Sequence, residues 1–364
     1  MSSVNILKTV LKLCPRFVEK ICLKKHYCIM RKFSINRQVY CSYFNNNNLH
    51  YNNCWKKKMF IIDNNGESRK SKNSYFIMGG IYTLFGLFKE KEEKEEEPEY
   101  ITAMKRSILA MQRGEFKKAE QMLHLALHMA QTIDHFKAQT YIFDLMANLA
   151  FEMGDFEKAE KLFVTVMQRL ISTGTAENDL RIVHMSLKLS KIYEAKGQLE
   201  KAEDGYKFCL HALKENPNNE ETKFFLLMTL DYYAHLLIEK SKELEAYKML
   251  LQAYELSIPI NGIEHEQTIT ILNDLGTIEC RQGNYNLSIQ HLNEALKAAE
   301  KLEDFESSAL HINLGFTYLK QGLYEEAKKS CKEGQIIARM IKNSESLNEA
   351  NVCLEEIKNL SKRK

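Results

Sequence analysis

Few side chains in this 364-residue sequence are spaced in a way that could support metal chemistry. His124 and His128 lie four residues apart, so a helix would direct both imidazoles to one side, where they could share a metal ion. No third ligand is evident near them, which favours an ordinary helix surface. His265-Glu266 lacks the second histidine of the HExxH zinc motif. We therefore predict no metal site and no cofactor.

The motifs of common enzyme classes are also missing from the sequence. There is no GxSxG nucleophile motif and no glycine-rich phosphate loop, since Gly79-Gly80 lies inside an apolar run. No pair of carboxylates is set apart from the charged helix faces. We predict that the protein is not an enzyme and has no small-molecule substrate.

The nine cysteines form neither a CxxC motif nor a zinc spacing. Five lie before residue 55, and four are scattered downstream at positions 209, 280, 331 and 353. Small thiols often fill close contacts between helices. We predict that these four are reduced thiols that pack between helices.

A short sequence motif, which we call the phrase, occurs six times and predicts the helices that would position any site. The copies begin between 39 and 44 residues apart, at Gly114, Gly154, Gly197, Ser241, Gly283 and Gly322. A small residue stands five positions after each start, at Ala119, Ala159, Ala202, Ala246, Ser288 and Ala327. Glycine ends one helix, and the small residue lets a neighbouring helix approach closely. Each phrase therefore predicts a turn between two helices.

A fixed period of this size is typical of helical solenoids. The glycine and alanine positions resemble the tetratricopeptide pattern, with a HEAT-like hairpin repeat as the alternative. We predict an all-α solenoid of about six tetratricopeptide-like repeats over residues 100–343. Residues 344–364 are predicted to form a capping helix and tail, because an apolar face there can cover the last repeat.

Solenoids of this kind usually bind partners along the first helix of each hairpin. The positions predicted to face such a groove are Tyr141, Asp144, Asn148, Phe151, Lys191, Asp231, His235, Asn273 and Arg281. This mixture of polar and aromatic groups suits a peptide segment or a loop of a protein partner. The alternative is that they are ordinary solvated side chains.

The amino-terminal segment differs from the repeats in its charge. Residues 1–58 contain twelve Lys or Arg residues and a single acid, Glu19, and their first turns have amphipathic spacing. This pattern predicts a mitochondrial transit peptide within an unstructured basic segment. A disordered basic tail is the alternative. Residues 75–364 carry a net charge of −9, which argues against nucleic-acid binding.

A short apolar run separates this segment from the repeats. Residues 59–74 read as a linker, 75–88 as an uncharged apolar helix, and 89–99 as an acidic spacer. Helix 75–88 has aromatic residues at both ends, as membrane helices do, but it is short for a bilayer of about 30 Å. We predict a membrane-embedded helix, with an apolar helix packed on the first repeat as the alternative.

Several longer stretches resemble a mitochondrial branch of the tetratricopeptide repeat family. They include AQTYIFDLMANLAFEMGDFEKAEKLF and SLKLSKIYEAKGQLEKAEDGYKFCL, and the similarity extends over about residues 100–361. The resemblance implies a protein of the mitochondrial inner membrane whose partners are respiratory complex III and its Rieske iron–sulfur subunit. It implies a role in assembly and maintenance of that complex, including turnover of Rieske fragments. The alternative is a soluble adaptor or scaffold of the kinesin light chain type, without a membrane anchor.

Overall fold

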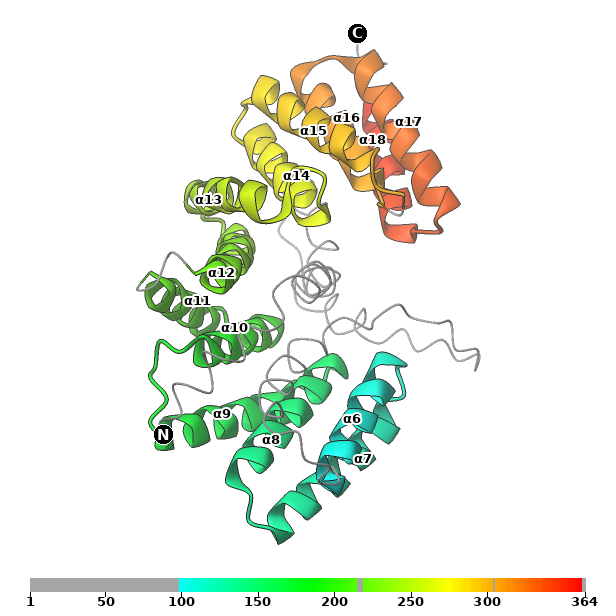
Figure 1. Cartoon of the computed structure of the whole chain (residues 1–364). Coiled ribbons are helices and arrows are strands. Elements are labelled where there is room, and N and C mark those ends of the chain that lie inside the picture. Colours follow the sequence, from blue (N-terminus) through cyan, green and yellow to red (C-terminus); the bar gives the residue numbers. More distant parts are fainter. Residues whose placement is uncertain (1–97, 215–218, 304, 362–364) are drawn as a thin grey trace. The chain divides into compact units, whose positions relative to one another are not determined.

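The computed structural model describes residues 98–214, 219–303 and 305–361, and these residues form thirteen α-helices and no strands (Figure 1). The predictions for residues 1–58, 59–74 and 75–88, and for most of 89–99, lie outside the described residues. Within the described ranges, no helix combines the length and apolar character needed to cross a membrane.

The described helices fall into two compact units, and each consists of antiparallel hairpins. We call the first helix of each hairpin its A helix and the second its B helix. The first unit holds three hairpins, with bounds α6 (Glu99–Gln112), α7 (Phe116–Thr132), α8 (Phe136–Glu152), α9 (Phe156–Ser172), α10 (Leu180–Ala195) and α11 (Leu199–Leu213).

The second unit holds three further hairpins and a last helix. Their bounds are α12 (Glu220–Glu239), α13 (Glu243–Asn261), α14 (Glu266–Arg281), α15 (Tyr285–Ala299), α16 (Ser308–Gln321), α17 (Tyr324–Met340) and α18 (Ser344–Ser361). Six hairpins and a capping helix confirm the predicted tetratricopeptide-like solenoid.

The turn inside each hairpin is the start of the repeated phrase. All six starting residues have positive φ, between 57° at Ser241 and 87° at Gly322. Glycine adopts this conformation at little cost, whereas a residue with a Cβ is strained there. Ser241 is the one departure from glycine among the six, and it has the same backbone conformation.

The small residue of the phrase marks the contact between the two helices of a hairpin. All six of these residues, from Ala119 to Ala327, are fully buried at 0 % exposure. Gly276 shows why bulk is excluded at such contacts, since a Cβ built there would lie 2.7 Å from Cγ of Leu292. The small residues therefore recur in the sequence because the two helices of each hairpin pack closely at these positions.

The capping helix α18 packs on the last hairpin through an apolar face. Ala350, Cys353 and Ile357 are buried against Ile312 and Phe316 of α16. This face confirms the predicted cap.

The prediction for the cysteines is partly wrong. Cys331 of α17 and Cys353 of α18 form a disulfide, with their Cα atoms 6.3 Å apart. Such pairing depends on how two helices lie against one another, which their 22-residue separation does not reveal. Cys209 and Cys280 are free thiols, as predicted.

Candidate functional site

The predicted groove positions all lie on A helices, but few of them are open to solvent. Asp144 and Arg281 are partly buried, and the other seven positions are buried. Asn148, His235 and Asn273 each contact a polar group on the next A helix. We call this series of contacts the A-helix ladder.

In the first unit the ladder joins α8 to α10 through a buried lysine. Lys188 is 2 % exposed, and its Nζ donates a hydrogen bond to Oδ1 of Asn148. Burial lowers the pKa of Lys188 to about 8, although the carboxyl groups of Asp144 and Glu152 oppose the shift. Burial also raises the pKa of Glu152 to about 8. The protein therefore holds this lysine and these acids in a buried environment, and burial disfavours their charged forms.

A second polar group in this unit lies between α10 and α11. Nζ of Lys191 is 3.1 Å from both carboxylate oxygens of Glu194, and the hydroxyl of Tyr206 donates to Glu194 Oε2 at 2.9 Å. The ring of Phe151, another groove position, meets Phe156 of the same hairpin edge-on, with the ring centroids 5.8 Å apart.

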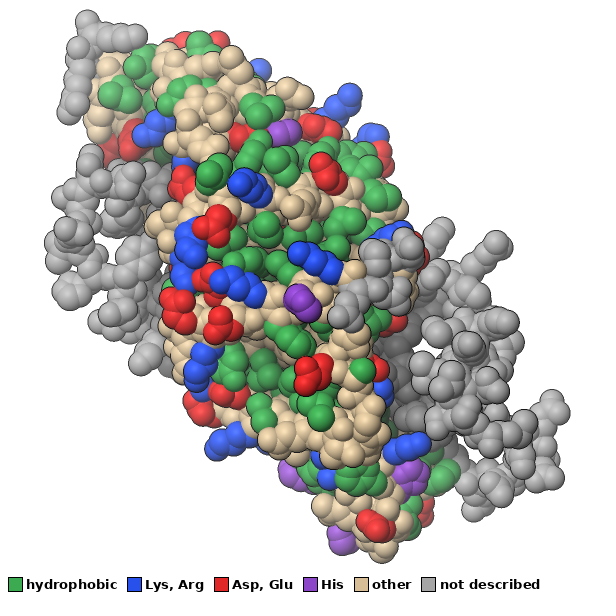
Figure 2. Space-filling model, turned by 90° about the vertical axis from the view of Figure 1, so that its left-hand side faces the viewer, with side chains coloured by type: hydrophobic (Ala, Val, Ile, Leu, Met, Phe, Trp, Pro, Cys, Tyr) green, Lys and Arg blue, Asp and Glu red, His purple; other side chains and the backbone are tan. Residues whose placement is uncertain are grey.

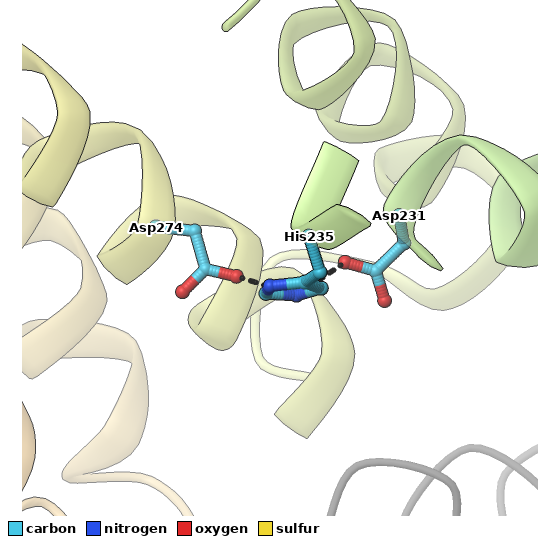
Figure 3. A group of neighbouring side chains, drawn as sticks. All are labelled: Asp231, His235 and Asp274. Atoms are coloured by element: carbon cyan, nitrogen blue, oxygen red, sulfur yellow. Dashed lines mark ion pairs between the residues drawn. The ribbon is translucent and has the colours of Figure 1, made fainter. Parts of the chain in front are cut away.

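In the second unit the ladder includes a buried histidine between two aspartates (Figure 3). His235 and Asp231 are one turn apart on α12, and Asp274 comes from α14. Nε2 of His235 is 3.4 Å from Oδ1 of Asp231 and 3.3 Å from Oδ2 of Asp274. Burial by itself would lower the pKa of His235, but the two carboxylates overcome it and raise this pKa to about 9.

The ladder continues from α14 to α16 through two amides. Nδ2 of Asn313 donates to Oδ1 of Asn273 at 2.8 Å, and both residues are buried. Arg281, near the end of α14, instead reaches the B helix α13, where its Nη1 is 3.3 Å from Oε1 of Glu243.

The histidines considered first in the sequence lie elsewhere. His124 and His128 are exposed on the B helix α7. His265 caps the start of α14, because its Nδ1 accepts a hydrogen bond from the backbone N–H of Gln267 at 3.1 Å. Among the described residues, the group that could hold a metal ion is Asp231, His235 and Asp274.

Sequence reasoning placed Asp231 and His235 on the ladder but missed Lys188 and Asp274. A usable signal was present, because residues one repeat apart on successive A helices meet. Asn148 and Lys188 are 40 residues apart, and His235 and Asp274 are 39 residues apart. A search for polar pairs at this spacing would have found both.

The surface drawn in Figure 2 carries lysine and arginine side chains interspersed with aspartate and glutamate, with apolar side chains between them. No broad basic patch covers the described residues of that face.

Comparison with known proteins places this architecture in a family. The tetratricopeptide repeat family model matches residues 225–301. A relative from Drosophila melanogaster, named tetratricopeptide repeat protein 19 homolog, mitochondrial, is 36 % identical and covers 80 % of each chain. The human tetratricopeptide repeat protein 19, mitochondrial, is 33 % identical over 76 % of each chain. The chain belongs to the tetratricopeptide repeat protein 19 family.

Solved structures support the same fold for this family member. The apo form of RapI aligns with a TM-score of 0.58 at 16 % identity, over 74 % of this chain and 73 % of that one. BtubC (BKLC) from P. vanneervenii aligns with a TM-score of 0.53 at 19 % identity, over 63 % of this chain and 91 % of that one. The chain is thus a tetratricopeptide solenoid, an architecture that binds proteins through its stacked helices.

Proposed function

We propose that this protein is a non-enzymatic binding solenoid of the mitochondrial inner membrane that acts in assembly and maintenance of respiratory complex III. Its work there includes turnover of fragments of the Rieske iron–sulfur subunit. The observation that carries the proposal is family membership, since relatives named mitochondrial match about four-fifths of the chain. The basic, acid-poor residues 1–58 support import into mitochondria.

The partner-binding surface in this proposal is the A-helix face. Most of its predicted positions are buried in contacts within the solenoid, so a partner could reach few of these side chains directly. Arg281 is the position best suited to a test, because it is only partly buried and pairs with Glu243 near the surface. Its partner Glu243 is 38 % exposed, and ion pairs near the surface contribute little to stability.

The first experiment is affinity purification of the tagged full-length chain from mitochondria. Complex III subunits are expected to copurify with the wild-type chain and to be reduced with Arg281→Ala. Arg339→Ala is the matched control, because Arg339 is exposed on the B helix α17. Equal recovery of complex III subunits with both variants would mean that Arg281 is not part of the binding surface. If no complex III subunit copurified with the wild-type chain, the proposed partner would be contradicted.

A second experiment addresses the role in turnover. Cells that lack the protein are expected to accumulate fragments of the Rieske subunit and to regain normal levels when the wild-type chain is restored. Unchanged levels of Rieske fragments would contradict the proposed role in turnover but would not contradict the proposed binding function.

The membrane anchor in this proposal is residues 75–88. Carbonate extraction of mitochondria should leave the wild-type chain in the pellet. Replacing Ile81 and Leu84 by arginine should release it, since each arginine at the centre of a membrane helix costs about 2.5–3.5 kcal/mol. Wild-type protein in the carbonate supernatant would favour the packed-helix alternative.

The side of the membrane follows from charge. Basic residues precede the anchor and glutamates follow it, so the positive-inside bias favours repeats in the intermembrane space. Protease added to mitoplasts should then digest the repeats, and protection would place them in the matrix. The alternative adaptor of the kinesin light chain type would instead be found in the cytosolic fraction, without an anchor.

A further inference from the structure

The contacts of His235 are unusual for a histidine that simply carries a proton between two acids. Both carboxylate oxygens approach the same ring nitrogen, Nε2 (Figure 3). An imidazolium has one N–H on each ring nitrogen, so a single N–H cannot point along both directions. Nε2 has no hydrogen-bond partner among the described residues.

The separations agree better with a shared metal ion than with hydrogen bonds. Charge-assisted N–H···O⁻ bonds are about 2.7–2.9 Å long. The two contacts of His235 are longer, at 3.4 and 3.3 Å. Two ligands held at about 2.0–2.1 Å from a tetrahedral zinc ion are themselves about 3.4 Å apart. The three ligand atoms lie within 4.8 Å of one another, so small side-chain shifts would bring them around one ion.

The donor set also selects the kind of ion. One imidazole nitrogen with two carboxylate oxygens suits Zn²⁺ and similar transition metals, whereas Ca²⁺ and Mg²⁺ prefer oxygen ligands alone. Two carboxylates with a neutral imidazole carry a formal charge of −2, which a divalent cation balances. Asp231, His235 and Asp274 are all buried, at 0, 7 and 1 % exposure, so an ion held between them would be shielded from water.

We propose that Asp231, His235 and Asp274 bind one divalent metal ion of the zinc class, which links the A helices α12 and α14 of consecutive hairpins. Three protein ligands leave a fourth position for water or for a donor from a partner. The ion stabilises the contact between two repeats. This site is independent of the proposed role at complex III.

The test uses the purified full-length chain after treatment with a chelator and removal of that chelator. Co²⁺ serves as a spectroscopic probe and Zn²⁺ as its competitor. Wild type should bind one equivalent more than Asp274→Asn and His235→Gln, and Zn²⁺ should raise its melting temperature. His124→Gln is the control, because it removes an exposed histidine from α7 and should bind like wild type.

X-ray absorption of the zinc-loaded wild type gives a readout that does not depend on the folding of any variant. A coordination shell of nitrogen and oxygen at about 2.0–2.2 Å, without sulfur, supports the site. A sulfur shell would place the metal on cysteines and overturn the proposal. Equal metal binding by wild type and both cluster variants would overturn it as well, and His235 would then only bridge the two aspartates.

Discussion

The protonation of His235 should make the stability of the metal-free protein depend on pH. Replacing His235 by glutamine removes the titrating group from the cluster with Asp231 and Asp274. We expect the free energy of unfolding of the wild type, relative to His235→Gln, to be larger at pH 6.5 than at pH 9.5.

The size and sign follow from the environment of the ring. The pKa of His235 is raised from 6.5 to about 9 in the folded protein. A folded-state pKa above the unfolded value stabilises the protein fully below pH 6.5, and this contribution is lost as pH rises through about 9. The shift corresponds to roughly 3 kcal/mol between these limits.

The assay is urea unfolding of both proteins in the presence of chelator, followed by circular dichroism across that pH range. Other groups titrate in the same range, because the pKa values of Glu152 and Lys188 are both about 8. These two groups are common to wild type and variant, so the difference between the two curves isolates His235. A difference that is the same at pH 6.5 and 9.5 would refute the reasoning, and so would one that grows as pH rises.

Three further predictions concern the repeats and the cap. Ser241→Gly should raise the stability by about 0.5–1 kcal/mol, because Ser241 has φ of 57° where glycine is unstrained; Ser241→Ala should give no gain in thermal melting. Ala159→Leu should cost about 1–3 kcal/mol because Ala159 is fully buried, and an unchanged melting temperature would contradict the assigned helix contact. Reduction of the Cys331–Cys353 disulfide should cost about 3 kcal/mol, measured by melting with and without reductant. Cys353→Ser should not respond to the reductant.

The hairpins could be predicted from the sequence because their signals are local. A residue with positive φ and a small residue five positions later are both constraints within one turn and its following helix. Even Ser241 could be placed, since the phrase around it kept the period of the other five copies. The disulfide between Cys331 and Cys353 had no such local signal, because it depends on the packing of α18 against α17.

The candidate site could be predicted only in part, for a related reason. The sequence period placed Asn273 on the face toward its neighbours, and Asn273 does bond to Asn313 of α16. The adjacent Asp274 is the residue that meets His235 of α12. Consecutive residues of a helix point about 100° apart, so one helix can serve both neighbours through two adjacent positions. The sequence pattern predicts one inward-facing residue in this turn of α14, whereas two adjacent residues contact neighbouring A helices.

The same geometry explains why a potential metal site occurs at one place in the ladder. Stacked hairpins bring residues about 40 positions apart into contact at each step, whatever their side chains are. At Asn148 and Lys188 the step joins an amide to an ammonium group, and at Asn273 and Asn313 it joins two amides. Neither pair offers the donors that zinc prefers. Only the step from α12 to α14 brings an imidazole and two carboxylates together among the described residues, so the repeat supplies the position and the individual side chains supply the chemistry.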